Sequence, residues 1–391
     1  MSIVKKVITG FLLLVVVAAG AFFIFAPAWV DKDQNKLRAH QPYPVSERAR
    51  TLHGAMFVGD WHADSLLWKR DLTKRNTRGH VDIPRLLEGG VGLQVFTTVT
   101  KSPAALNYER NSADARDNIT LLAIGQLWPM RTWQSLFQRA LYQAEKLVEF
   151  ERRVPDQLKI VRGLQDLEDL VQARQSGKRV VGGLLGMEGG HALEEKLENL
   201  GKLYDAGFRL IGLQHFFDNE LGGSLHGISN RGLTEFGKAV VLEAEQKGWI
   251  VDLAHSSPAV ARDVLEITDM PLVVSHTGVH GFCASKRNFE DPLMKAIVAS
   301  GGVVGLGYWP DVVCGNISPA GIAKMVLKAI EIVGEDHISL GSDYDGTVET
   351  AFDTSELPAL TSALLEAGLT ETQVRKVMGE NMLRVMRARL K

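Results

Sequence analysis

Eight short apolar runs, separated by helix-forming segments, are the feature that most constrains the fold of this chain. They are continuous and rich in β-branched residues, as expected of strands buried on both faces. The runs are 56–59, 91–96, 180–185, 209–213, 249–253, 272–274, 302–306 and 337–340. Helical patterns between them include 237–247, 257–267 and 322–333. This alternation favours parallel βαβ units, and eight units predict a closed (β/α)8 barrel of the TIM type. A doubly wound open sheet is the main structural alternative.

Two segments extend the minimal barrel. Residues 107–175 are long, charged and helix-like, and they lie between the second and third predicted strands. We interpret them as a helical insertion packed on the barrel, whose last part could be the ordinary crossover helix. Residues 370–390 predict a final helix. Residues 31–54 are polar and contain proline, so we interpret them as a tether that leads into a barrel domain at 55–391.

The N-terminus carries an apolar run that is separate from the barrel. Residues 7–30 contain no charged side chain, and as a helix they would span about 36 Å, enough for a hydrocarbon core of about 30 Å. Lys5 and Lys6 precede the run, as in a signal-anchor. We predict that residues 1–30 are an uncleaved transmembrane anchor that leaves the rest of the chain periplasmic or extracellular. Ala26-Pro27-Ala28 resembles a cleavage site, so a cleaved, secreted form is the alternative.

Composition limits the remaining classes. The chain has 391 residues and a formal net charge of −2, and no basic tract follows the N-terminus, which argues against a nucleic-acid partner. The two cysteines, Cys283 and Cys314, are too few for a disulfide framework or a thiolate zinc cluster. We expect both to be buried free thiols, with a single disulfide as the alternative.

Histidines and carboxylates follow six of the eight predicted strands. The segments are Asp60-Trp61-His62-Ala63-Asp64, Glu188-Gly189-Gly190-His191, Gln214-His215, Asp252-Leu253-Ala254-His255, Ser275-His276 and Ser342-Asp343-Tyr344-Asp345. In a parallel barrel all C-terminal strand ends meet on one face, where the active site lies. The sequence therefore predicts one polar site built from several strands.

Five of these residues form a ligand set for metal ions. His62 and Asp64 are two residues apart on a strand, so they share a face and can bind the same ion. Imidazole and carboxylate ligands suit zinc, with manganese or iron as substitutes. Because five ligands exceed the needs of one catalytic zinc ion, we expect two ions that share Glu188. The first would bind His62, Asp64 and Glu188, and the second Glu188, His255 and His276.

Two further side chains complete a hydrolytic site. Two ions about 3.5–4 Å apart can share a hydroxide that attacks a carbonyl carbon at neutral pH. Asp343 is our choice for the proton shuttle to the leaving amine, and Asp345 could exchange roles with it. His215 is our choice for contact with the substrate carbonyl oxygen and the developing oxyanion.

Taken together, these motifs resemble the renal-type membrane dipeptidases, binuclear zinc peptidases of family M19 with an amidohydrolase-like fold. The similar segments are 60–64, 82–94, 187–191, 252–255, 275–276 and 341–346. The resemblance implies two zinc ions per chain, a dipeptide substrate, and the ligand set and catalytic pair named above. It permits a homodimer. It also adds Arg287, because Ala284-Ser285-Lys286-Arg287-Asn288 resembles the family segment whose arginine binds the substrate carboxylate.

One departure keeps other functions open. Residues 214–227 differ from the usual family pattern around His215, on a loop that should frame the substrate. A related binuclear hydrolase acting on another amide, an N-acyl amino acid or a lactone is therefore the first alternative. An inactive, membrane-tethered binding protein is a remote second. His191, His226 and His280 are additional candidates for the pocket.

Overall fold

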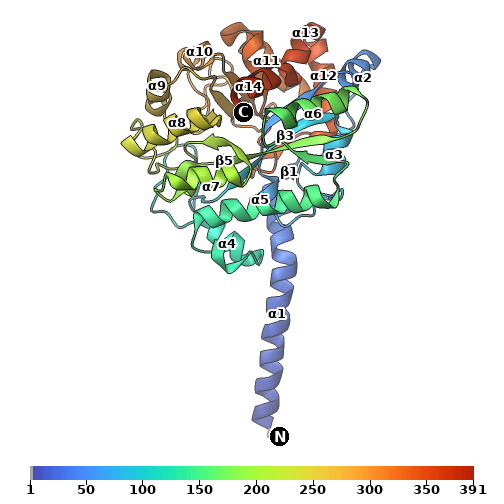
Figure 1. Cartoon of the computed structure of the whole chain (residues 1–391). Coiled ribbons are helices and arrows are strands. Elements are labelled where there is room, and N and C mark those ends of the chain that lie inside the picture. The colour runs from blue at the N-terminus through green and yellow to red at the C-terminus, as the bar shows by residue number, and fades with distance from the viewer. Residues whose placement is uncertain (1–2) are drawn as a thin grey trace.

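A long N-terminal helix and a barrel make up the computed structural model, which describes residues 3–391. Helix α1 (Ile3–Gln34) projects from one end of the domain, and the chain's N-terminus lies at its far tip (Figure 1). This helix contains the whole apolar run that begins at Val7 and ends at Val30. It is long and apolar enough to cross a membrane.

The eight predicted strands form the barrel. They are β2 (Val58–Ala63), β3 (Val91–Val99), β5 (Val181–Glu188), β6 (Phe208–Gly212), β7 (Ile250–Asp252), β8 (Val273–Thr277), β9 (Val303–Leu306) and β10 (Ile338–Leu340). Within residues 3–391 these eight strands pair in parallel, each with the next, and the pairs β3–β5 and β10–β2 complete the ring. The closed barrel is confirmed, and the open sheet is excluded.

The barrel strands are buried along their whole length, which explains why their sequences are apolar without alternation. Helices then begin at capping side chains. Thr234, Ser257 and Ser318 each accept a hydrogen bond from the third backbone N–H beyond them, at the starts of α8 (Glu235–Lys247), α9 (Pro258–Ile267) and α11 (Pro319–Val333). Proline at the first helical position reinforces the last two starts.

Further helices pack against the ring (Figure 1). They are α3 (Ile83–Glu88), α7 (Glu198–Asp205), α10 (Asp291–Ala299), α12 (Leu357–Glu366), α13 (Glu371–Arg375) and α14 (Asn381–Arg389). A π-helical turn (Lys376–Glu380) joins α13 to α14, so the predicted final helix is one helical stretch with an irregular centre. This turn packs directly against the backbone of Phe57. It can do so because residue 379 is a glycine: a Cβ there would lie 2.1 Å from the backbone oxygen of Phe57.

The insertion between β3 and β5 holds more than the predicted helices. It contains α4 (Asn118–Gly125), α5 (Leu136–Arg153), β4 (Leu158–Ile160) and α6 (Leu164–Gln175). Strand β4 pairs with the first residues of β5, on the edge of β5 that β6 occupies further along the strand. The sequence did not predict β4, because three residues carry too little periodicity to distinguish a strand from a loop.

The segment expected to be a tether is docked on the barrel. Asp31 and Asn35 are buried, and β1 (Lys36–Leu37) pairs in parallel with β11 (Glu349–Thr350). Helix α2 (Glu47–Gly54) then packs beside α12. Asp31 is buried because its carboxylate pairs with the guanidinium groups of Arg70 and Arg78, at 3.2 and 2.7 Å. Those partners are distant in sequence, so a polar composition alone could not reveal the docking.

The expectation of two free thiols is wrong. Cys283 and Cys314 form a disulfide across a sequence separation of 31 residues. The bridge joins the loop after β8, which carries Arg287, to the loop after β9. The two cysteines meet because β8 and β9 are neighbours in the ring, a relation that becomes visible only when the barrel closes.

Replacing both cysteines, Cys283→Ser and Cys314→Ser, should lower the free energy of unfolding by about 3–4 kcal/mol, since the bridge restricts a loop of this length in the unfolded chain. Urea unfolding of the oxidised wild type and the double variant measures the difference. Thiol titration of the unfolded, unreduced wild type should find no free thiol. Equal unfolding midpoints together with two titratable thiols would contradict the bridge.

Candidate binuclear metal and active site

The five predicted ligands converge at the C-terminal end of the barrel. His62 lies on β2 with Asp64 just beyond it, Glu188 is the last residue of β5, His255 follows β7, and His276 lies on β8. All five are at most 3% exposed. Barrel closure thus brings together side chains that are up to 214 residues apart in sequence (276 − 62).

Glu188 is the centre of this cluster. Its Oε1 lies 3.5 Å from His62 Nε2, 3.2 Å from His255 Nε2 and 3.5 Å from His276 Nε2. His62 Nε2 is also 3.5 Å from Asp64 Oδ1, and the two Nε2 atoms of His255 and His276 are 2.8 Å apart. The spacing is compatible with a carboxylate shared between two ions.

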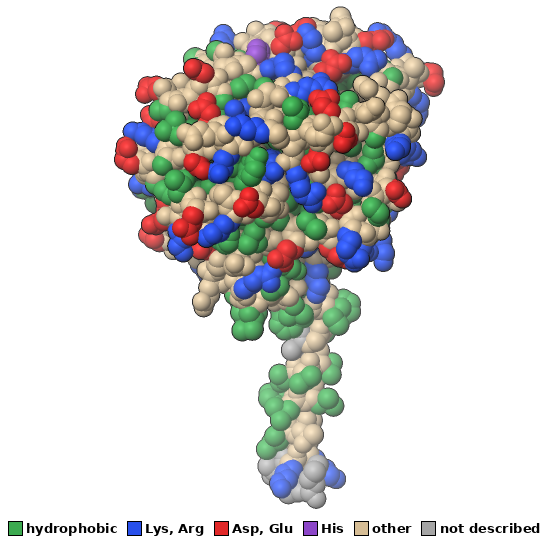
Figure 2. Space-filling view, in the orientation of Figure 1, with side chains coloured by type: hydrophobic (Ala, Val, Ile, Leu, Met, Phe, Trp, Pro, Cys, Tyr) green, Lys and Arg blue, Asp and Glu red, His purple; other side chains and the backbone are tan. Residues whose placement is uncertain are grey.

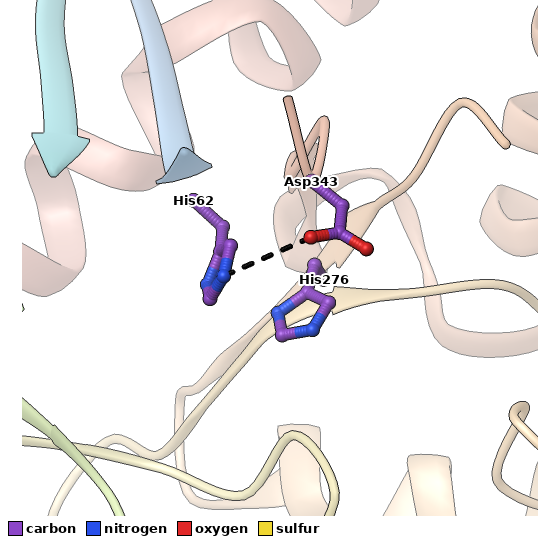
Figure 3. A group of neighbouring side chains, drawn as sticks. All are labelled: His62, His276 and Asp343. Carbon is purple, nitrogen blue, oxygen red and sulfur yellow. Dashed lines mark ion pairs between the residues drawn. The ribbon is translucent and has the colours of Figure 1, made fainter. Parts of the chain in front are cut away.

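Three groups of donor atoms lie close enough to hold an ion. One is the predicted first triad, His62, Asp64 and Glu188. The second contains Glu188 and His255 together with His215, and the third contains His62, His276 and Asp343 (Figure 3). The predicted second triad is therefore gathered around Glu188, but His215 and Asp343 approach the same atoms.

A hydrogen-bond network orients the imidazoles. Ser275 Oγ donates to Asp252 Oδ2 at 2.6 Å, so it accepts from His276 Nδ1 at 2.8 Å. That assignment leaves the lone pair of His276 Nε2 facing Glu188. Asp252 and Ser275 were absent from the predicted site residues, although the carboxylate precedes His255 by three positions at a strand end.

Asp60 plays a similar part beside His62. Its carboxylate accepts from the backbone N–H of His62 at 2.9 Å and from that of Ser342 at 3.2 Å. It thereby connects β2 to the loop after β10. Thr97 Oγ1 donates to Asp64 Oδ1 at 2.5 Å and fixes that carboxylate. A strand-end aspartate two or three residues before a histidine is the sequence signal for both supporting carboxylates, Asp60 and Asp252.

The electrostatics of the cluster fit divalent cations. Burial and the charge of Asp64 raise the pKa of Glu188 well above its usual range. Burial lowers the pKa values of His255 and His276, so both offer neutral nitrogen. Burial alone would lower the pKa of His62, but Glu188 and Asp64 raise it to about 10. Buried carboxylates beside imidazole nitrogens are the ligand set of zinc-type ions, whose charge would compensate the mutual repulsion of the carboxylates and take the place of the proton on His62.

Two residues of the site hold left-handed backbone conformations. His255 has φ 63° and Asp343 has φ 59°, and neither is a glycine. Such conformations cost of order 1–3 kcal/mol and persist where surrounding contacts enforce them, which is common at functional sites.

Asp343 and His215 lie beside the cluster. Asp343 Oδ1 is 3.8 Å from His62 Nε2, and burial raises the pKa of Asp343 to about 8, aided by Asp64 and opposed by His62 (Figure 3). His215 Nε2 is 3.4 Å from Glu188 Oε2. Burial lowers the pKa of His215 to about 4, and its Nδ1 lies 3.3 Å from the Lys101 carbonyl oxygen.

Arg287 is buried beside the same cluster of histidines and carboxylates. Its Nη2 donates to the His276 carbonyl oxygen at 2.7 Å, and its guanidinium lies 5.6 Å from the Trp309 ring centroid. Within the described chain, its Nε has no hydrogen-bond partner. A buried guanidinium with an unused donor is suited to binding an anionic group that enters the site.

A cavity of about 350 Å³ connects these side chains. Its wall includes Glu188, His215, His255, His276, Arg287 and Asp343, and the ring of Phe216 also lines it. A cavity of this size accommodates a small molecule. The cavity thus joins every predicted catalytic and substrate-binding residue to the metal-ligand cluster.

Asp345, the alternative proton shuttle, has a different environment. It pairs with Arg70 at 2.6 Å and accepts from Ser65 Oγ at 2.6 Å and the His80 backbone N–H at 2.7 Å. Burial would raise the pKa of Asp345, but Arg70 and His80 hold it far below its usual range. This aspartate is part of a buried ion pair instead of the cavity wall.

The additional histidines also lie outside the cavity wall as the described residues define it. His191 Nε2 is 3.0 Å from Thr100 Oγ1, and His226 Nδ1 is 2.9 Å from the Tyr108 carbonyl oxygen. Burial lowers the pKa of each to about 3. His226 lies behind Phe216, at 5.0 Å between ring centroids, and supports a residue of the wall.

Comparison with known proteins decides the family. The family model described as membrane dipeptidase (peptidase family M19) matches residues 46–390. The chain belongs to this family. It is therefore a metallo-dipeptidase of family M19 by descent, with buried His, Glu and Asp groups that can bind metal.

Several solved structures resemble this chain. The dipeptidase AC of family M19 is 26% identical, with 86% of this chain and 99% of that chain covered and a TM-score of 0.69. A metallo peptidase from Rhodobacter sphaeroides, bound to a phosphinate mimic of the dipeptide L-Ala-D-Ala, is 25% identical over 86% and 99%, with a TM-score of 0.67. The probable dipeptidase PvdM from Pseudomonas aeruginosa shares the fold at 17% identity, over 88% and 97%, with a TM-score of 0.72.

Replacing Asp343 or Asp345 by asparagine should change the stability of the protein by different amounts. Asp345→Asn removes the nearer of the two carboxylates that pair with the buried Arg70 guanidinium and leaves it only Asp31, so the free energy of unfolding should fall by about 3 kcal/mol. Asp343→Asn removes a carboxylate whose charge burial disfavours, so stability should change by less than about 1 kcal/mol. Urea unfolding of the two variants tests the contrast, and equal losses would contradict it.

Proposed function

We propose that this protein hydrolyses the peptide bond of dipeptides outside the cytoplasm, using two zinc ions, while α1 anchors it in a membrane. The main observation in support of this proposal is that Glu188 Oε1 lies 3.2–3.5 Å from three imidazole nitrogens. The same cavity holds a buried carboxyl group at Asp343 and a buried guanidinium at Arg287. Acid–base, anion-binding and metal-ligating groups thus face one small space.

We assign the ligands as follows. His62, Asp64 and Glu188 would hold the first ion, and Glu188, His255 and His276 would hold the second. When bound, such an ion pair lowers the pKa of water to about 7 and polarises a carbonyl. The chain's own contribution is to hold neutral imidazoles in fixed tautomers, as the bond between Ser275 Oγ and His276 Nδ1 does, and to keep the carboxylates buried.

Asp343 moves the proton in this scheme. As a carboxylate it accepts a proton from the attacking water, and it then donates that proton to the nitrogen of the leaving amine. Burial raises the pKa of Asp343 to about 8 in the ion-free site, which places its proton affinity near neutrality. Bound cations would favour its ionised form, as a base requires.

His215 contacts the substrate carbonyl oxygen. Its Nδ1 faces the Lys101 carbonyl oxygen, which can only accept, so the first proton of the ring lies on Nδ1. The ring donates to the substrate oxygen from Nε2 when a second proton, taken up from solvent, is bound there, and negative charge developing on that oxygen favours this protonated form. The contact consequently becomes stronger in the transition state than in the ground state, which is the condition for catalysis.

Arg287 binds the carboxylate of the substrate. Its unpartnered Nε and its outer nitrogens form the planar donor set that suits a carboxylate, and the Trp309 ring flanks the group. An anion-binding group this close to the ligand cluster limits the length of chain beyond the scissile bond. This limit favours dipeptides over longer peptides.

The N-terminal helix and the disulfide support a location outside the cytoplasm. Helix α1 contains the apolar run 7–30, with Lys5 and Lys6 before it. A structural disulfide persists in oxidising compartments and is rare in the cytosol. We propose that α1 stays attached as an anchor.

The substrate and the metal can be tested together with the full chain in detergent. The purified protein, with and without added zinc, is offered Gly-Leu, Leu-D-Ala, a tripeptide, an N-acetyl amino acid and a lactone. We expect zinc-dependent cleavage of the dipeptides alone. Turnover of only the acyl or lactone substrates would contradict the dipeptide assignment and favour the alternative suggested by residues 214–227.

Two variants separate metal binding from proton transfer in the same assay. Glu188→Ala should lose both activity and bound metal, because it removes the shared ligand. Asp343→Asn should keep two metal equivalents by elemental analysis but lose about 10²-fold or more in kcat. Metal loss in Asp343→Asn would instead indicate that Asp343 is a ligand.

Arg287→Ala should lower kcat/KM for dipeptides by about 10²-fold, mainly through KM, because a charged hydrogen-bonded partner of the carboxylate is lost. The wild type should discriminate strongly against a C-terminally amidated dipeptide, and this discrimination should shrink in the variant. Lys286→Ala is the matched control, since Lys286 is exposed and pairs with Glu109. If Arg287→Ala discriminates between the dipeptide and its C-terminal amide as strongly as the wild type does, Arg287 does not bind the substrate carboxylate.

A further inference from the structure

We propose that the insertion carries a second membrane contact, in which three apolar side chains rest in the interfacial layer of the lipid bilayer beside α1. These residues, Leu121, Leu127 and Met130, are called the apolar tip below. The partner is a lipid surface. The inference rests on the proposed anchoring role of α1.

The apolar tip stands out by its exposure. Leu121 is 54% exposed, Leu127 58% and Met130 76%. Among residues 35–391 they are the three most exposed large hydrophobic side chains, and all lie within one ten-residue stretch (121–130) of α4 and the loop after it. Scattered single exposures need no explanation, but a cluster of this kind marks an interaction site.

The length of α1 sets the depth at which the bilayer ends. A hydrocarbon core of about 30 Å takes about 20 helical residues, and the uncharged run begins at Val7. The far boundary therefore falls shortly before Trp29, which is 68% exposed, and the first charge follows at Asp31. Tryptophan favours the membrane–water interface, so this level is where headgroups are expected.

The insertion meets α1 at that level. Val30 packs against a buried apolar cluster that includes Ile119 and Ala123 of α4. These two residues are four positions apart and form the inner face of α4, so Leu121 lies on the opposite side of the helix. Figure 1 shows α4 next to the barrel end of α1, and Figure 2 shows hydrophobic side chains gathered around the point where α1 leaves the domain.

The junction between α1 and the barrel is fixed. Asp31 pairs with Arg70 and Arg78, and Asn35 Oδ1 accepts from the backbone N–H of Thr347 at 3.0 Å. The pairing of β1 with β11 follows directly. The end of α1 beyond Pro27 therefore cannot turn relative to the barrel without breaking these contacts, and the apolar tip keeps its place beside this end of the helix.

The same geometry orients the catalytic side. Thr347 lines the cavity and is bonded to Asn35, only five residues beyond Val30. That part of the cavity wall is therefore held close to the level of the membrane surface. Contact of the apolar tip with lipid would keep this orientation constant.

Fluorescent labels at three positions test the proposal in the full chain. Met130→Cys, Leu242→Cys and Val16→Cys each receive an environment-sensitive fluorophore, while the native cysteines stay in their disulfide. Met130 and Leu242 are both exposed, at 76% and 42%, so neither change disturbs packing. Leu242 on α8 is the control remote from α1, and Val16 reports on α1 itself. The proteins are reconstituted in phosphatidylcholine vesicles without nitroxide, with lipids that carry a shallow nitroxide for position 130, and with lipids that carry a deep nitroxide for position 16.

We expect a blue-shifted emission and nitroxide quenching at positions 16 and 130, but neither at 242. If only position 16 responds, the anchor stands and the apolar tip is not a lipid contact. If position 16 also fails to respond, the anchoring proposal and this inference both fail. A blue shift at 130 without nitroxide quenching would show that a second copy of the chain covers the apolar tip, which would overturn the lipid assignment.

Discussion

Closure of the barrel is the constraint on which the rest of this structure depends. The ring is completed where β10 pairs with β2, at Leu340 opposite Asp60, and where β3 pairs with β5. Asp60 reinforces the first of these joints by accepting from the backbone N–H groups of His62 and Ser342. Without this joint the His62 and Asp343 side chains, from opposite ends of the barrel sequence, would not lie within 3.8 Å of each other.

Closure also concentrates charge that would be unfavourable in isolation. Glu188, Asp64 and Asp343 are buried close together, and burial with mutual repulsion raises the pKa values of Glu188 and Asp343. Two residues beyond Asp343, the Asp345 carboxylate is stabilised by Arg70 and serves the fold. The contrast shows that one loop holds one carboxyl group with a raised pKa in the cavity wall and another with a lowered pKa in an ion pair, each proton affinity set by its neighbours.

The residues that precede the family match pack on the barrel and belong to the same folded domain. The family match begins at residue 46, yet Asp31 and Asn35 are buried against residues that belong to the barrel. Asn35 binds Thr347 in the cavity wall, and the Arg70 guanidinium contacts both Asp31 and Asp345. The end of α1 and the loop that carries Asp343 therefore share a buried hydrogen-bond and ion-pair network. Under the anchoring role proposed for α1, this joint would set the orientation of the domain at the membrane, whereas a loose tether would not.

The barrel could be predicted from the sequence, because burial on both faces leaves a local, continuous apolar signal in each of the eight strands. It also indicated the site, since parallel strands bring all their C-terminal ends to one face and six of those ends carry His, Asp or Glu. Only the tertiary structure decided which of Asp343 and Asp345 faces the cavity, that Cys283 and Cys314 are bridged, and that residues 31–38 are docked. It also revealed Ser275, Asp252 and Asp60 as the residues that orient the ligands. Each of these outcomes depends on pairings between residues from different strands or loops, and such pairings exist only once the ring has closed.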